Sequence, residues 1–224
     1  PRSITQPTAG MHGGHSGHTT WWRAIAKIRS AMRDNGDDLL RWLAKRQIAR
    51  ICVVSPHLDD ACFSLATFLR WKALPPRTVV TVFTEARIDS DDRHTRAMGF
   101  NDPLQEFAAR REEDRVAMQM LGVSMLHAGA EVDRFDAKAA TAATAQIVGV
   151  AAVPDQPRRG LVLLPIGAGQ PVSALKRLLR RMQRLPVGCG AHAEHEWVRD
   201  GLLVPLMAAE LHVGFYAEIP YIWS

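Results

Sequence analysis

Hydrophobic and polar positions alternate along the chain in two different rhythms. Four short, mostly apolar runs have the length and the β-branched content of buried strands, and they cover 49–55, 77–85, 123–129 and 160–167. Apolar residues at helical spacing fill the intervals at 59–74, 102–121 and 136–152. Strand and helix in regular alternation predict an α/β, Rossmann-like fold, with a largely parallel β-sheet flanked by helices.

The segment before the first strand has a helical pattern of its own. Its apolar residues predict an N-terminal helical appendage over 20–47, packed against the main domain through an apolar stripe. Residues 1–19 are rich in Gly, Ser, Thr, Pro and His without a hydrophobic period, which is typical of a flexible leader. We therefore expect a single domain over 20–224 that includes the helical segment.

Composition adds little to this picture. The 224 residues are 47% hydrophobic, as in ordinary globular proteins, and the formal net charge of +5 comes from 28 basic and 23 acidic residues. The two signs are interspersed except in a basic cluster from Lys176 to Arg184, within the segment 172–188. No nucleic-acid reading motif accompanies the cluster, so we expect no nucleic-acid partner. A solvated amphipathic helix, a lid and a partner surface all remain open for it.

The cysteines and the apolar runs bear on the cellular compartment. Three cysteines, Cys52, Cys62 and Cys189, form no regular disulfide framework, which favours a reducing compartment. No apolar run reaches about 18 residues, and the N-terminus lacks a secretory pattern. We expect a cytoplasmic protein without a membrane span, and the sequence leaves its oligomeric state open.

Chemically costly side chains gather after the first strand. His57, Asp59 and Asp60 lie in "PHLDD", where an α/β fold presents side chains to ligands. Farther along the chain, His192 and His195 are three residues apart in "AHAEHEW". One histidine, one aspartate and a distant histidine form a facial ligand set for a divalent metal, which would leave the other aspartate free as a base.

Each of these motifs also has a simpler explanation. An Asp-Asp pair at the start of a helix often caps backbone N–H groups. Histidines three residues apart are often only surface or core residues. The histidines of "HGGHSGH" lie in a Gly/Ser tract and are more typical of a disordered segment than of a built site.

Four segments, in order, resemble the PIG-L/LmbE-like zinc-dependent N-deacetylases. "PHLDDA" resembles the P-H-P-D-D-E motif of this family, and "AHAEH" resembles its H-P-D-H motif. Between them, "RREEDRVAMQMLG" is similar to its R-x-x-E-x-x-x-A-x-x-x-L-G helix, and "FYAEIPY" is similar to its Y-E-D-x-P-Y segment. The resemblance extends over about residues 48–222.

This resemblance implies roles for five residues. It implies that His57, Asp60 and His195 bind Zn²⁺, with another divalent transition metal as an alternative, and that Asp59 is the general base. It also implies that His192 lies beside the metal and stabilises developing charge.

The chain departs from the family motifs at four positions, which are Leu58, Ala61, Ala193 and Glu194. None of them removes an expected ligand or base. Ala61 replaces a glutamate, and we expect this loss of a carboxylate to loosen the orientation of the site.

The function that follows is a metal-dependent hydrolase that removes the N-acetyl group from an N-acetylglucosamine-type sugar on a larger conjugate. The expected substrate is a small-molecule glycoconjugate, and a glycopeptide antibiotic pseudoaglycone is the first choice. Deacetylation of a mycothiol precursor or of an aminoglycoside is an alternative. A noncatalytic sugar-binding protein with the same fold is another.

Overall fold

The computed structural model describes residues 36–87, 93–167 and 193–218 of the chain. The chain divides into two compact units, one up to Lys45 and one from Arg46 onward. In the first unit, residues 36–45 form a helix, in agreement with the helical pattern of the sequence. Its packing on the rest of the chain stays a prediction, and the leader 1–19 lies outside the described residues.

A five-stranded parallel sheet forms the centre of the second unit, in the order β3-β2-β1-β4-β5. Its strands are β1 (Arg50–Ser55), β2 (Arg77–Glu85), β3 (Ser124–Glu131), β4 (Gly160–Pro165) and β5 (His212–Tyr216). The central strand β1 is apolar from Ile51 to Val54 and almost fully buried, as expected for a strand covered on both faces. The predicted α/β fold with a largely parallel sheet is therefore confirmed.

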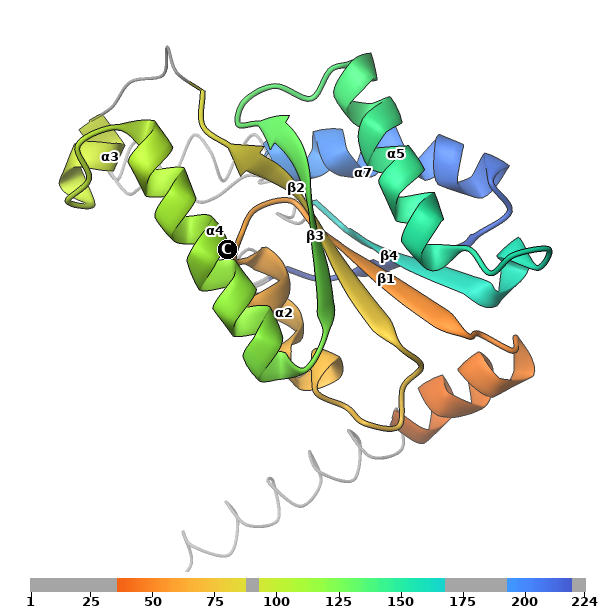
Figure 1. The fold of residues 1–224 in the computed structure, drawn as a ribbon. Coiled ribbons are helices and arrows are strands. Elements are labelled where there is room, and N and C mark those ends of the chain that lie inside the picture. The colour runs from red at the N-terminus through yellow and green to blue at the C-terminus, as the bar shows by residue number, and fades with distance from the viewer. Residues whose placement is uncertain (1–35, 88–92, 168–192, 219–224) are drawn as a thin grey trace, which may run out of the picture. The chain divides into compact units, whose positions relative to one another are not determined.

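Helices cover both faces of this sheet (Figure 1). The helices described in this unit are α2 (Asp60–Leu69), α3 (Arg93–Ala97), α4 (Pro103–Leu121), α5 (Ala137–Ala151) and α7 (Ala193–Ala208), with a short 3₁₀ turn at Pro157–Arg159. On one face α2 and α4 pack against β1, β2 and β3, and on the other α5 and α7 pack against the sheet. The larger apolar core lies beneath α5 and α7, where Ile147, Leu202 and Leu206 are fully buried.

Local signals in the sequence account for most of the helix ends. The carboxylate of Asp102 accepts a hydrogen bond from the Gln105 N–H (2.8 Å), and Pro103 is the first residue of α4, where a missing N–H costs nothing. Gly122 ends α4 in the left-handed conformation. The helix predicted over 59–74 is shorter than expected and ends at Leu69, because a turn leads from there into two prolines. The Arg77 guanidinium donates hydrogen bonds to carbonyls of that turn.

The fifth strand, β5, has no counterpart among the predicted elements. It is only five residues long and contains Gly214, so its sequence shows no clear strand period. Of its side chains, only that of Tyr216 is buried. Pairing with β4 stabilises it, and the Tyr216 hydroxyl donates a hydrogen bond to the Val54 carbonyl in β1 (2.9 Å). Within the described residues, no helix is both long enough and apolar enough to cross a membrane.

The strand order determines where a ligand can bind. The chain moves from β1 to β2 on one side, whereas β4 pairs with β1 on the other side. In a sheet of this kind the connections diverge at the carboxyl ends of the two central strands, and the crevice between them is the usual ligand site. The loop after β1 and the start of α7 both lie at this crevice.

A close contact at the start of β4 gives a test of the fold. A Cβ atom added to Gly160 would lie 2.4 Å from the Ala151 carbonyl oxygen, so Gly160→Ala should lower the free energy of unfolding by roughly 1–3 kcal/mol. Gly149, inside α5, has open space at the corresponding position. Gly149→Ala should therefore raise it by up to about 1 kcal/mol. Urea unfolding measures both, and equal midpoints for the two variants would contradict this account.

Candidate metal centre

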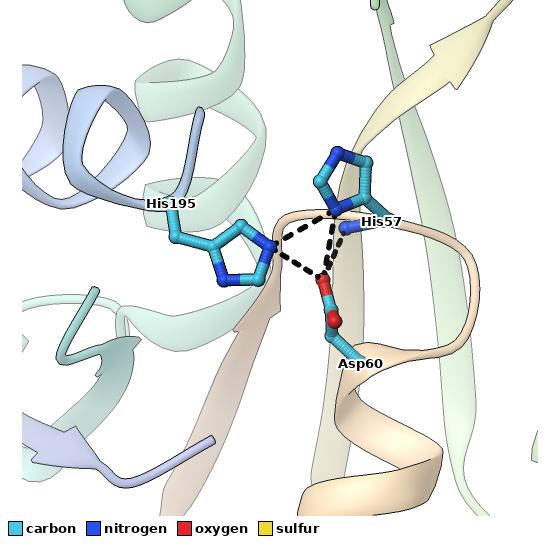
Figure 2. A group of neighbouring side chains, drawn as sticks. All are labelled: His57, Asp60 and His195. Carbon is cyan, nitrogen blue, oxygen red and sulfur yellow. Dashed lines mark hydrogen bonds and ion pairs between the residues drawn. The ribbon is translucent and has the colours of Figure 1, made fainter. Parts of the chain in front are cut away.

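Two histidines and an aspartate converge at the crevice between β1 and β4 (Figure 2). His57 comes from the loop after β1, Asp60 is the first residue of α2, and His195 lies in the first turn of α7. The His57 Nδ1 atom lies 3.1 Å from both Asp60 Oδ2 and His195 Nε2. The His195 Nε2 atom lies 3.2 Å from Asp60 Oδ2, so the three atoms form a nearly equilateral triangle.

This triangle has the dimensions of one face of a metal's coordination shell. Zinc is bound by histidine nitrogen and carboxylate oxygen at about 2.0–2.2 Å, so neighbouring ligand atoms of one ion lie roughly 3 Å apart. Each of the three residues offers one such atom, and the group could hold a metal ion. The sequence motifs predicted that these three residues form one ligand set, and in the structure their side chains are in contact.

A buried serine shapes the loop that presents two of these residues. The Ser55 hydroxyl donates to the His57 carbonyl (2.6 Å) and accepts from the Ala61 N–H (3.0 Å), which fixes both the loop and the start of α2. The His57 N–H in turn donates to the Asp60 carboxylate (2.9 Å). Asp59 is the N-cap residue, but its side chain accepts no capping hydrogen bond. The simple capping explanation for the two aspartates therefore does not describe what their side chains do.

A buried glutamate lies behind each histidine. Glu194 is hydrogen-bonded to His57 Nε2 (2.8 Å), and Glu218 is hydrogen-bonded to His195 Nδ1. If these nitrogens donate to the carboxylates, the opposite nitrogen of each ring is left as an acceptor that faces the triangle. Neither role was predicted from the sequence, in which Glu194 stands only as a departure from a motif and Glu218 only as part of one.

Both glutamates are anchored to the protein backbone. Glu194 accepts the Asp133 N–H (2.6 Å) beyond β3, and Glu218 accepts the Gly167 N–H (2.8 Å) beyond β4. Ala61 is buried and its N–H binds Ser55, so the carboxylates that hold the histidines come from elsewhere in the chain. The orientation of the site thus does not depend on a glutamate at position 61.

The electrostatics of the cluster favour a bound cation. Burial opposes protonation of His57, but its hydrogen bonds to Asp60 and Glu194 raise its pKa to about 9. His195 behaves in the same way, since Asp60 and Glu218 overcome the effect of burial and raise its pKa to about 9. Burial alone would raise the pKa of Asp60, but the two histidines hold it below its usual range. Three buried carboxylates beside two imidazoles carry excess negative charge, which a divalent ion would neutralise.

Of the two expected catalytic residues, Asp59 and His192, the structure describes only Asp59. The Asp59 side chain belongs to the residue just before Asp60; it is 46% exposed, and its Oδ2 atom lies 3.7 Å from Arg110 Nη2. Burial and the nearby Asp60 raise the pKa of Asp59, against the opposing effects of Arg110 and His57. His192 lies outside the described residues, as do Cys189 and the basic segment 172–188.

Solved structures with this fold include deacetylases from glycopeptide pathways. A deacetylase triple mutant of the teicoplanin biosynthetic pathway is 24% identical with a TM-score of 0.55, and the match covers 77% of this chain and 65% of that one. The pseudoaglycone deacetylase of the antimicrobial reagent A40926 is 22% identical with a TM-score of 0.56, covering 79% and 67%. The chain has the fold of these deacetylases. It spans about two thirds of their length.

A third structure is the zinc-inhibited form of the teicoplanin deacetylase. It is 21% identical with a TM-score of 0.53, and the match covers 77% of this chain and 69% of that one. No protein-family model matches the sequence, and no curated protein matches it. The similarity to these solved deacetylases nevertheless confirms, at the level of the fold, the resemblance noted in the sequence motifs.

Loss of a triangle residue should remove the metal. His195→Ala leaves one histidine and one carboxylate, too few for a three-ligand site, so zinc content after dialysis should fall to near zero. His127→Gln is the control, because His127 is a histidine bound to Asp114 (3.0 Å) and not part of the triangle. Zinc is measured by mass spectrometry of the intact folded protein. Full zinc content in His195→Ala would exclude the triangle as the binding site.

The glutamate behind His195 should affect metal affinity without being a ligand. Glu218→Gln keeps the shape of the side chain but removes its charge, and metal affinity should weaken by about 10–100-fold. Glu210→Gln is the matched control, since Glu210 lies eight positions earlier and pairs on the surface with Arg158 (3.0 Å). Competition with a chromophoric chelator gives both affinities. Equal values would show that Glu218 does not support His195.

Proposed function

We propose that the chain is a zinc-dependent N-deacetylase that removes the acetyl group from an N-acetylglucosamine-type sugar on a larger conjugate. The observation that carries the proposal is the triangle of His57, Asp60 and His195, and Asp59, the residue before Asp60, offers the further carboxylate that the proposal needs. The fold, which the chain shares with glycopeptide deacetylases, and the four sequence motifs support the same reaction.

The donor set fits zinc, because two imidazole nitrogens and one carboxylate oxygen are typical of hydrolytic zinc sites with a position left open. Zinc bound here would supply Lewis acidity toward a water molecule and toward the carbonyl of the acetamide. In the proposed reaction Asp59 accepts the proton of the attacking water and returns it to the amine as the C–N bond breaks. The products are acetate and the free amino sugar.

His192 completes the proposed machinery. A protonated imidazole three residues before His195 would face the negative charge that develops on the acetyl carbonyl oxygen, and would stabilise it as a charged hydrogen-bond donor. This role comes from the sequence resemblance, and His192 lies outside the described residues. Asp59 and His192 would then have separate tasks, one moving a proton and the other stabilising charge.

The proposed acceptor is a glycopeptide antibiotic pseudoaglycone. Support comes from the A40926 pseudoaglycone deacetylase, whose fold the chain shares over 79% of its own length. The physiological metal is proposed to be zinc, with another divalent transition metal as the alternative. Because a deacetylase of the same fold has been solved in a zinc-inhibited form, metal should be supplied in the test at one equivalent and not in excess.

Acetate release is the direct test. Metal-free protein is reconstituted with one equivalent of Zn²⁺, Mn²⁺ or Co²⁺, then incubated with an acetylated glycopeptide pseudoaglycone, a mycothiol precursor, an N-acetylated aminoglycoside or free N-acetylglucosamine. We expect acetate from the glycopeptide conjugate above all. Binding of a conjugate without acetate release under any metal would instead indicate the noncatalytic sugar-binding alternative.

Two neighbouring aspartates provide a sharper test of the mechanism. Asp59→Asn should keep its metal and lose about 10²–10⁴ in kcat, because an amide of the same shape cannot accept the proton of the water. Asp60→Asn should instead lose metal. Metal content and single-turnover acetate release are measured on both variants. If the two phenotypes were exchanged, the roles of the two aspartates would have to be exchanged as well.

A further inference from the structure

A buried carboxylate on α4 takes no part in the candidate metal centre. Glu106 is only 4% exposed. Its Oε2 atom accepts a hydrogen bond from the Thr95 hydroxyl (2.6 Å), and its Oε1 atom lies 3.5 Å from Arg110 Nη1. An ionised carboxylate is unfavourable in such a place unless it is paired, and Arg110 pairs with it.

Arg110 lies one turn farther along α4 and joins two carboxylates. One side of its guanidinium contacts Glu106, and Nη2 on the other lies 3.7 Å from Asp59 Oδ2. The guanidinium also lies over the Phe107 ring, with its central carbon 5.6 Å from the ring centroid. Arg110 is thus held by Glu106 and Phe107 while it faces Asp59.

The same helix also holds the residue next to Asp59. Leu58, which stands where the family motif has proline, is buried with Phe107 and Ala86 in a small apolar cluster. Phe107 therefore fixes the backbone of the loop through Leu58. The half-exposed side chain of Asp59 lies outside this apolar cluster and forms an ion pair with Arg110.

We propose that Arg110 is a positioning residue that holds the Asp59 carboxylate beside the metal centre, and that Glu106, supported by Thr95, holds Arg110 in place. This inference rests on the proposed function, in which Asp59 is the base. The 3.7 Å separation matters, because it is longer than a direct hydrogen bond of about 2.7–3.2 Å. Arg110 therefore attracts the carboxylate without donating a direct hydrogen bond to it, so Arg110 does not compete with the attacking water for the carboxylate oxygen.

The first experiment compares two arginines of α4. Arg110→Met removes the charge and keeps a long apolar side chain, and kcat should fall about tenfold or more with KM and metal content unchanged. Arg115→Met is the matched control, because Arg115 pairs with Glu112 on the exposed side of the same helix. This control should keep the wild-type kcat. Equal kcat values in the two variants would overturn the proposal.

A double-mutant cycle then asks whether Arg110 acts through Asp59. In an Asp59→Asn background, Arg110→Met should cause little further loss of kcat, because the group that it positions is already inactive. An equal loss in the wild-type and Asp59→Asn backgrounds would show that Arg110 acts elsewhere, and would overturn the proposal. Glu106→Gln should reproduce part of the loss seen in Arg110→Met, and Arg110→Lys should restore part of it.

A measurement without turnover separates this inference from the proposed reaction. Carbodiimide coupling of an amine to exposed carboxyl groups, read by peptide mass spectrometry on metal-loaded protein, reports how accessible Asp59 is. Labelling of Asp59 should rise several-fold in Arg110→Met and stay at the wild-type level in Arg115→Met. Unchanged labelling in Arg110→Met would overturn the positioning role even in an active enzyme. Failure to release acetate from any conjugate would instead overturn the proposed function.

Discussion

Two imidazole nitrogens and one carboxylate oxygen from two distant segments lie about 3 Å apart in a largely buried place, and the surrounding structure holds them there. Such a cluster is unfavourable without a cation, and it needs a rigid frame to bring its atoms together. The parallel sheet provides that frame, because β1 and β4 are neighbours although more than a hundred residues separate them. The loop after β1 and the start of α7 then meet at one edge.

The frame extends beyond the three residues themselves. Glu194 connects His57 to the backbone beyond β3, and Glu218 connects His195 to the backbone beyond β4. On the opposite side of the loop, α4 contacts Leu58 through Phe107 and Asp59 through Arg110. Elements from both faces of the sheet therefore control a loop of four residues.

The sequence predicts the parts of this arrangement that have a local signal. Apolar runs predicted four of the strands, and spacing together with family motifs pointed to His57, Asp60 and His195. Ser55 was missed because it looks like an ordinary strand end, and its role depends on a bond to Ala61 six residues away. Glu218 was missed because it comes close to its hydrogen-bond partner, His195, only after β5 has paired with β4. Such long-range contacts leave no periodic trace in the sequence.

The position of Glu218 has a consequence for the order in which the site is assembled. His57 and Asp60 lie more than 150 residues before Glu218, and the Glu218 carboxylate, which is hydrogen-bonded to His195, follows β5 and comes into place only when β5 docks beside β4. A nascent chain therefore presents His57 and Asp60 before the glutamate that contacts His195 has been made. On the proposed function, metal binding would follow completion of the sheet, and premature capture of a metal by His57 and Asp60 would compete with folding.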